Sequence, residues 1–192
     1  TELTELQYAF DTFYFLMCGV LVLWMAAGFT MLEAGMVRAK NTAEILTKNV
    51  ALFAIACIMY MLVGYQIMYP GVEGGYLPVF NFMIGTEHAA DAMVGDEAPY
   101  YSLLSDFFFQ VVFVATCMSI VSGAVAERMK LFAFLAFAVV MTGFIYPLQG
   151  YWKWGGGFLN EAGFLDFAGS GVVHLAGATA ALAGVLLLGA RT

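Results

Sequence analysis

Five long stretches with almost no charge constrain the fold of this chain more than any other feature of its sequence. A helix of about twenty apolar residues crosses the hydrocarbon core of a bilayer, whereas an open sheet would leave backbone groups without hydrogen bonds in lipid. Charged residues make up 11% of the 192 positions, against about a quarter in soluble domains. We therefore expect an all-α membrane protein with spans at about residues 10–32, 43–69, 107–126, 131–151 and 167–190.

The linkers between these spans differ in charge. Those after the first, third and fifth spans contain six of the seven Lys and Arg residues, if Lys48 near the start of the second span is counted with the first linker. Because basic residues favour the cytoplasmic side, we expect a plasma-membrane protein with its N-terminus outside and its residue-192 end in the cytoplasm. The loop from Gly71 to Asp106 has no Lys or Arg, and its carboxylates are Glu73, Glu87, Asp91, Asp96, Glu97 and Asp106. An acidic outer surface raises the local cation concentration modestly, or is simply a solvated loop face.

An odd number of spans has a consequence for architecture. A tandem copy of a five-span unit enters the membrane from the opposite face, which gives the inverted repeat of many transporters. The sequence contains no visible internal repeat and stops just after Arg191. We therefore expect the first half of a longer protein.

The polar composition excludes several classes of site. Cys18, Cys57 and Cys117 each lie inside an apolar run, and their odd number argues against a disulfide framework. No Cys or His cluster has the spacing of metal ligands, so no metal or other cofactor is expected. The net charge of −7 resides in loops and does not indicate a nucleic-acid partner.

His174 is the most informative single residue, because an ionisable group inside a span is costly and usually belongs to a pathway. If Asp166 caps the fifth helix, eight residues at 1.5 Å each place His174 about 12 Å deeper, near the bilayer midplane. We expect the imidazole to be buried there with a hydrogen-bond partner, on a segment beyond residue 192 or, alternatively, at a neighbouring backbone carbonyl.

Asp166 itself has two compatible interpretations. As a helix cap, it would accept hydrogen bonds from the first free amides of the fifth span. As a carboxylate at the outer mouth, it would favour a nearby cation through its charge.

Aromatic and glycine residues accompany these polar groups. Trp154 and Phe113 offer aromatic faces that attract small cations, although a membrane Trp is often an interfacial anchor and a Phe often packs in the core or against lipid. The run Gly155–Gly157 suits a loop with positive φ or close backbone approach. No Lys-Ser/Thr follows it, as a phosphate-binding loop would require.

The chain resembles the ammonium transporter family, whose relatives include methylamine permeases and Rhesus proteins. The matching segments are Gly35-Met-Val-Arg-Ala-Lys-Asn41, Phe109-Gln-Val-Val-Phe113, Gly123-Ala-Val-Ala-Glu-Arg128, Trp154-Gly-Gly-Gly157 and Leu165-Asp-Phe-Ala-Gly-Ser-Gly-Val-Val-His174. The resemblance implies eleven spans built from five plus five inverted, homotrimers with one pore per subunit, and ammonium as substrate with methylammonium as its analogue. A PII-type cytoplasmic regulator is a further implied partner.

The resemblance also implies roles for individual residues. Trp154 and Phe113 match the aromatic part of an outer ammonium-recruitment site, and Asp166 matches the carboxylate near it. Phe113 also matches the outer of two phenyl gates, and His174 the first of two pore imidazoles that relay protons. The second phenyl, the second His and a serine of the recruitment site belong to spans beyond residue 192, so a five-span piece should not conduct by itself.

Two other classes compete with transport. An ammonium-sensing membrane domain of a signalling protein would share these spans. An enzyme is disfavoured, because His174 and Asp166 lie at different depths and do not form a nucleophile–base pair.

Overall fold

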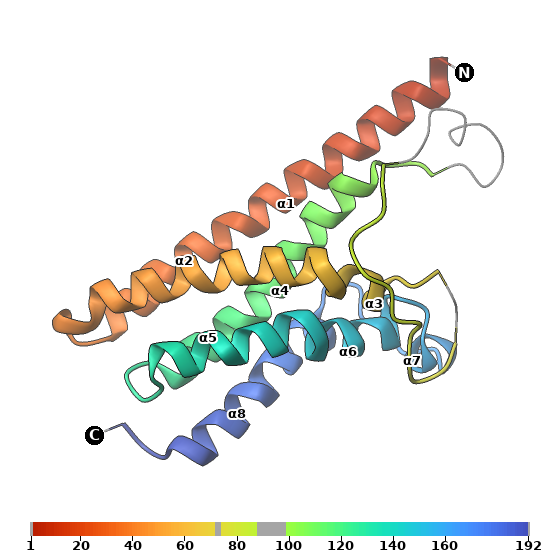
Figure 1. Ribbon diagram of the computed structural model, residues 1–192. Coiled ribbons are helices and arrows are strands. Elements are labelled where there is room, and N and C mark those ends of the chain that lie inside the picture. The colour runs from red at the N-terminus through yellow and green to blue at the C-terminus, as the bar shows by residue number, and fades with distance from the viewer. Residues whose placement is uncertain (1, 72–73, 88–98, 192) are drawn as a thin grey trace.

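The computed structural model describes residues 2–71, 74–87 and 99–191, and these residues form helices and loops without a strand. Five helical segments are long and apolar enough to cross a membrane (Figure 1). They are Glu2–Met36, Ala39–Met68, Leu103–Val125, Leu131–Glu161 and Ser170–Leu188. The all-α, five-span fold expected from the sequence is therefore confirmed.

These segments divide into the helices labelled in Figure 1 and into short turns of other helix types. The α-helices are α1 (Glu2–Met36), α2 (Thr42–Met59), α3 (Tyr65–Met68), α4 (Leu103–Val125), α5 (Leu131–Val140), α6 (Tyr146–Lys153), α7 (Phe158–Glu161) and α8 (Ala176–Leu188). A 3₁₀ turn, η1 (Ala39–Asn41), precedes α2. The π-helical turns η2 (Tyr60–Gly64) and η4 (Met141–Ile145) interrupt the second and fourth spans, and a third, η5 (Ser170–Leu175), begins the fifth.

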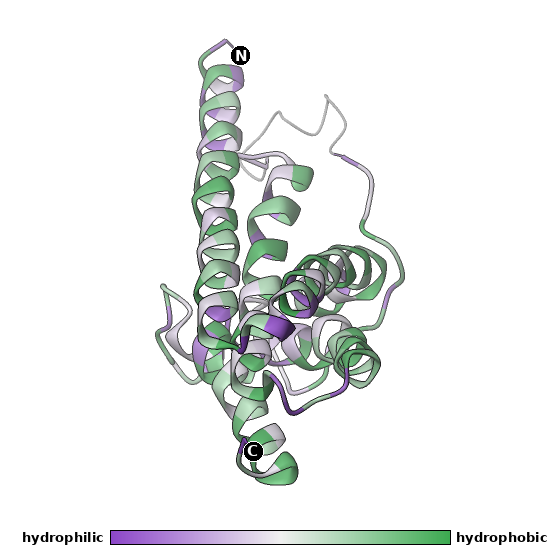
Figure 2. Ribbon diagram, turned by 90° about the vertical axis from the view of Figure 1, so that its left-hand side faces the viewer, coloured by the Kyte–Doolittle hydropathy of each residue, from purple (hydrophilic) through white to green (hydrophobic). Residues whose placement is uncertain are grey.

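Helix α4 is the centre of the bundle and packs against α1, α2 and α8. Its Val114, Ala115 and Met118 are fully buried. Close packing with α8 depends on Gly177, since a Cβ there would lie 2.8 Å from the carbonyl oxygen of Cys117. Helices α1 and α8 are less covered, and hydrophobic residues line most of their length in Figure 2. Their outward faces suit lipid or further protein.

The π-helical turns have local causes. Pro147 lacks an amide hydrogen and its ring clashes with the carbonyl four residues earlier, and η4 lies just before it. In η2, Met61 and Leu62 offer their carbonyl oxygens to the amides of Ile84 and Met83, at 2.9 and 2.6 Å. Part of the long loop is thereby joined to the second span.

The two ends of the bundle differ in character. The loop end carries residues 74–87 and 99–102, which form no helix or strand, together with α7; the basic end carries the α1–α2 turn, the α4–α5 turn and Arg191. The two chain termini lie at opposite ends (Figure 1). Glu73, Asp91, Asp96 and Glu97 of the predicted acidic loop lie outside the described residues.

The assignment of Asp106 to the loop was wrong. It lies in the first turn of α4, which begins at Leu103, and it is only 5% exposed. The α4 helix starts earlier than expected because Ser102 caps it, with its hydroxyl accepting from the amide of Ser105. Asp106 therefore contributes to the protein interior and not to an acidic surface.

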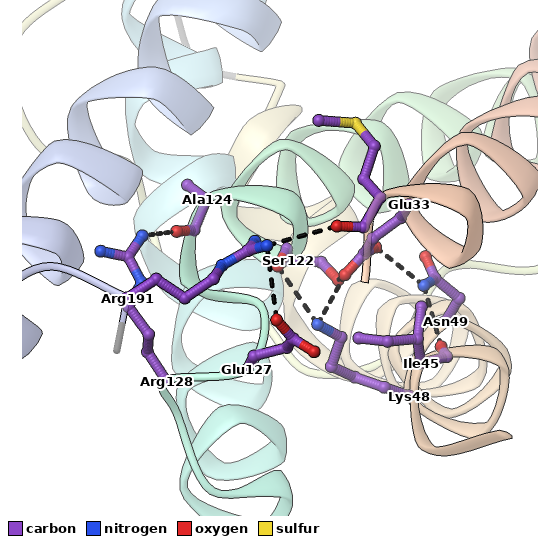
Figure 3. A network of polar contacts seen from close by, with 10 residues as sticks. Glu33, Ile45, Lys48, Asn49, Ser122, Ala124, Glu127, Arg128 and Arg191 are labelled. Atoms are coloured by element: carbon purple, nitrogen blue, oxygen red, sulfur yellow. Dashed lines mark hydrogen bonds and ion pairs between the residues drawn. The ribbon is translucent and has the colours of Figure 1, made fainter. Parts of the chain in front are cut away.

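Lys48 is likewise not a linker residue. It is buried in α2, and its Nζ lies 2.7 Å from Glu33 Oε1 of α1 (Figure 3). Ser122 Oγ and Asn49 Nδ2 also donate to the Glu33 carboxylate, at 2.8 and 2.9 Å. The ammonium group of Lys48 faces the Phe134 ring at 5.0 Å from its centroid. This buried network joins α1, α2 and α4.

A second polar cluster joins the turns of the basic end through Glu127 of the α4–α5 turn. Glu127 has a positive φ of 62°, which is uncommon for a residue with a side chain. Its Oε1 accepts hydrogen bonds from the Arg38 amide at 2.9 Å and from Asn41 Nδ2 at 2.6 Å. These hydrogen bonds hold the pKa of the Glu127 carboxyl at about 2, below its ordinary value of 4.5. Arg191 Nη1 lies 3.4 Å from Oε2 (Figure 3).

The Glu127 cluster should make stability depend on pH in the acid range. Because the folded-state pKa lies below the unfolded one, the stabilisation is complete above about pH 4.5 and is lost as the pH falls toward 2. We expect Glu127→Gln to lower the melting temperature of the full-length protein in detergent at pH 7, and this deficit to shrink at pH 3. Glu44→Gln, which removes an exposed carboxylate of α2, is the control, and an identical response of the two variants would contradict the prediction.

Candidate functional site

The glycine run after α6 lets the Trp154 loop fold back onto the second span. A Cβ on Gly155 would lie 1.9 Å from the carbonyl oxygen of Met68, and Gly156 has a φ of +85°. Both uses predicted for these glycines, close approach and positive φ, are therefore confirmed. The indole of Trp154 is held in place, since its Nε1 donates to the backbone oxygen of Asp166 at 2.8 Å.

Asp166 accepts three backbone hydrogen bonds at the start of the fifth span. Its Oδ1 accepts from the Ser170 amide at 2.8 Å, and its Oδ2 accepts from the amides of Gly171 and Val172 at 2.9 and 2.7 Å. The side chain is 8% exposed. The hydrogen bonds predicted for a capping Asp166 are therefore confirmed. Its predicted place as the N-cap residue was wrong, because Gly169 holds that position with a φ of +80° and the span begins at Ser170. His174 lies five residues beyond this cap and not eight. A negative charge at this position also complements the helix dipole.

Phe113 and Trp154 form an aromatic pair at the loop end. Their ring centroids are 6.2 Å apart at an interplanar angle of 70°, and Phe109 contacts Phe113 edge-on at 5.1 Å. A cavity of about 860 Å³ opens beside them. It is lined by Tyr14, Phe15, Cys18, Tyr69, Phe109, Gln110, Phe113, Lys153, Trp154, Leu165, Asp166, Phe167 and Ala168. The structure thus brings Trp154, Phe113 and Asp166 together in one cavity, which we name the aromatic cavity.

His174 does not line the aromatic cavity. It lies in the π-helical turn η5 and is exposed, whereas its neighbours Val172 and Val173 are buried. Within the described part of the chain, its imidazole has no hydrogen-bond partner, at a backbone carbonyl or elsewhere. The imidazole of His174 was expected to be buried, and this expectation was wrong for the part of the chain that the structure describes. No segment among residues 2–191 covers this side of η5.

Gln110, Tyr69 and Lys153 are among the lining residues of the aromatic cavity that were not predicted. Gln110 precedes Phe113 by three residues on α4, and this helical spacing was the signal that could have found it. Tyr69 comes directly before Pro70 and gave no such signal. Lys153 lines the cavity, and its Nζ donates to Asn160 Oδ1 at 2.7 Å. Among the described residues, no group of three His, Cys, Asp or Glu side chains could hold a metal ion.

Comparison with known proteins decides the family. The family model described as "Ammonium Transporter Family" matches residues 13–192. This chain belongs to the ammonium transporter family. Ammonium transporter Amt2 of Archaeoglobus fulgidus is 40% identical over 191 residues, which cover 94% of this chain and 39% of that protein.

Solved structures of the family agree with the fold. A structure named "Sensor Amt Protein" superposes with a TM-score of 0.84 at 31% identity, covering 97% of this chain and 46% of its own. Mep2 of Candida albicans superposes with a TM-score of 0.79 at 26% identity, covering 98% of this chain and 41% of its own. The ammonium transporter chain described here therefore spans less than half the length of these relatives.

Proposed function

We propose that the full-length protein carries ammonium across the plasma membrane, with its N-terminus outside. The observation that carries the proposal is the convergence of Trp154, Phe113 and Asp166 on one cavity at the loop end. Membership of the ammonium transporter family supports the substrate. Neither observation calls for catalysis or a cofactor.

Ammonium is recruited by the aromatic cavity. A small cation over the face of an aromatic ring gains about 0.5–2 kcal/mol, and Trp is the best such ring. The carboxylate of Asp166 is occupied by three backbone amides. It therefore acts on the cation through its charge and by fixing the turn that holds the Trp154 indole, without direct coordination.

Selection of ammonium over potassium takes place in the passage beyond the aromatic cavity, where the Phe113 ring is the outer gate. A narrow apolar pore imposes a large desolvation penalty on any ion. Potassium, which has a similar size and the same charge, cannot avoid this penalty. Ammonium can separate into neutral ammonia and a proton, and the imidazole of His174 takes part in relaying them, since histidine exchanges protons near neutral pH.

The remaining length of the protein completes the pore. The relatives are more than twice as long as the matched region, and a second five-span unit of opposite orientation would cover the exposed side of η5. That unit would supply the hydrogen-bond partner of His174 and the second gate. Assembly into homotrimers and binding of a PII-type regulator at the basic end stay predictions.

The test is ammonium-evoked current in membranes that contain the full-length protein. Trp154→Leu should raise the half-saturating ammonium concentration about two- to thirtyfold, as expected for a lost cation–π contact. His174→Ala should abolish the wild-type selectivity for ammonium over potassium. Trp152→Leu is the matched control, because Trp152 donates to the backbone oxygen of Tyr76 and lies outside the aromatic cavity. An unchanged current and selectivity in both site variants would refute the proposal.

Ammonium sensing is the second candidate, favoured by the similarity to the structure named "Sensor Amt Protein". A sensor would bind ammonium with the same residues and pass no ammonium. Saturable binding to the purified full-length protein without ammonium flux in vesicles would favour sensing over transport.

A further inference from the structure

Gln110 is a polar side chain at the aromatic cavity that the mechanism above does not use. It lines the cavity from α4, on the same side of the helix as Phe113. Most of the neighbouring lining is aromatic or aliphatic. An amide in such surroundings normally has all its hydrogen-bonding atoms paired.

The amide nitrogen of Gln110 is held from behind. Its Nε2 donates to Asp106 Oδ1 at 3.4 Å, and the hydroxyl of Tyr65 donates to Asp106 Oδ2 at 2.6 Å. Asp106 is 5% exposed, and Tyr65 is 7% exposed. The buried pair therefore fixes which end of the Gln110 amide turns toward Asp106, because a carboxylate accepts hydrogen bonds and the amide oxygen cannot donate.

The amide oxygen of Gln110 remains without a partner. Its Oε1 is buried and accepts no hydrogen bond from any described residue. Leaving a buried acceptor unpaired is unfavourable. Gln110 lines the aromatic cavity, and a rotation of its side chain that brings the shielded Oε1 to the cavity surface would let a bound N–H group remove that cost. Ammonium has four N–H groups, and the aromatic faces of Trp154 and Phe113 accept none of them as conventional hydrogen bonds.

We propose that Gln110 Oε1 accepts a hydrogen bond from the recruited ammonium ion, and that Asp106 and Tyr65 are the positioning residues that orient it. This inference rests on the proposed recruitment of ammonium at the aromatic cavity. It assigns a neutral, directional acceptor to a site whose aromatic faces accompany an Asp166 carboxylate that already accepts three backbone hydrogen bonds.

Gln110→Met tests the acceptor, because methionine keeps the length of the side chain and removes the amide. We expect the half-saturating ammonium concentration to rise about tenfold, as for one lost hydrogen bond to a charged group, with the maximal current nearly unchanged. The matched control is Gln66→Met on α3, a half-buried glutamine outside the aromatic cavity. Half-saturation equal to that of wild type in Gln110→Met would overturn the proposal and indicate that the amide only binds water.

The positioning role of Asp106 has its own signature. Asp106→Leu should raise half-saturation as Gln110→Met does, since the carboxylate that accepts from the amide nitrogen is then missing. Asp106→Asn should restore values near wild type, because its side-chain oxygen still accepts from Gln110. If the two Asp106 variants are equally impaired, a merely structural role of Asp106 replaces the positioning role.

Binding separates this inference from the proposed function. The melting temperature of the purified full-length protein is measured against ammonium chloride, with sodium chloride at equal ionic strength as reference. A stabilisation by ammonium that Gln110→Met loses and Gln66→Met keeps supports the inference even if wild type passes no current. A stabilisation that Gln110→Met retains in full contradicts the inference while leaving transport intact.

Discussion

Lys48→Met should lower the free energy of unfolding of the full-length protein by about 3–5 kcal/mol. The substitution keeps the length and the apolar stem of the side chain but removes the charge that lies 2.7 Å from Glu33. Glu33 is only 3% exposed, so its carboxylate would be left buried with neutral partners alone. Removing one member of a buried ion pair is strongly destabilising for this reason.

The measurement is denaturant unfolding in mixed micelles, with two companion variants. Lys40→Met removes an exposed lysine of the same end and should change stability little. Adding Glu33→Gln to Lys48→Met should recover most of the loss, because the glutamine oxygen still accepts from Ser122 or Asn49 and no charge is buried. If Lys48→Met alone is as stable as Lys40→Met, the ion pair between Lys48 and Glu33 does not stabilise the protein and the prediction is wrong.

Asp166→Ala should reduce ammonium transport by about 100-fold. This factor corresponds to a free-energy loss of about 2.7 kcal/mol, which is the size of one hydrogen bond to a charged group. The variant removes the acceptor for the amides of Ser170, Gly171 and Val172. The turn that presents the backbone oxygen to Trp154 would lose its anchor, and the negative charge beside the aromatic cavity would disappear.

Asp166→Asn separates these two effects. It keeps one oxygen for the amides but carries no charge, so we expect a melting temperature closer to wild type than that of Asp166→Ala, with half-saturation still raised. Glu161→Ala, an exposed carboxylate of α7, is the control. Wild-type currents in Asp166→Ala would contradict both the capping and the electrostatic contribution.

The spans could be predicted from local patterns, whereas the grouping of Trp154 with Phe113 came from the family resemblance, because the two residues lie on different spans and spacing alone does not distinguish Phe113 from its neighbours. Uncharged runs reveal a membrane helix, and the spacing within the Trp154 to Asp166 segment is preserved in the fold. Asp106 and Lys48 escaped prediction because a charge near a helix end was read as a loop residue. Lys48 is buried because its partners Glu33 and Ser122 lie on two other spans that pack against α2. Glu33 and Ser122 are 89 residues apart in the sequence, so no local pattern could reveal this arrangement.

The surroundings of His174 could not be predicted for a different reason. Its neighbours Val172 and Val173 face α4 within the chain, whereas the imidazole turns to a side that residues 2–191 leave open. A periodic pattern gives the depth of a residue along a helix. It does not show what covers each side of that helix.

The length of α1 has a consequence for the shape of the entrance. Its 35 residues measure about 52 Å at 1.5 Å per residue, whereas a hydrocarbon core is about 30 Å thick. Thr12 of α1 accepts a hydrogen bond from the Ser102 amide at 3.0 Å, so the helix is attached to the loop just before α4. Helix α1 is therefore about 22 Å longer than a hydrocarbon core. Its first turns extend past Thr12 beside the aromatic cavity, which Tyr14, Phe15 and Cys18 of the same helix line.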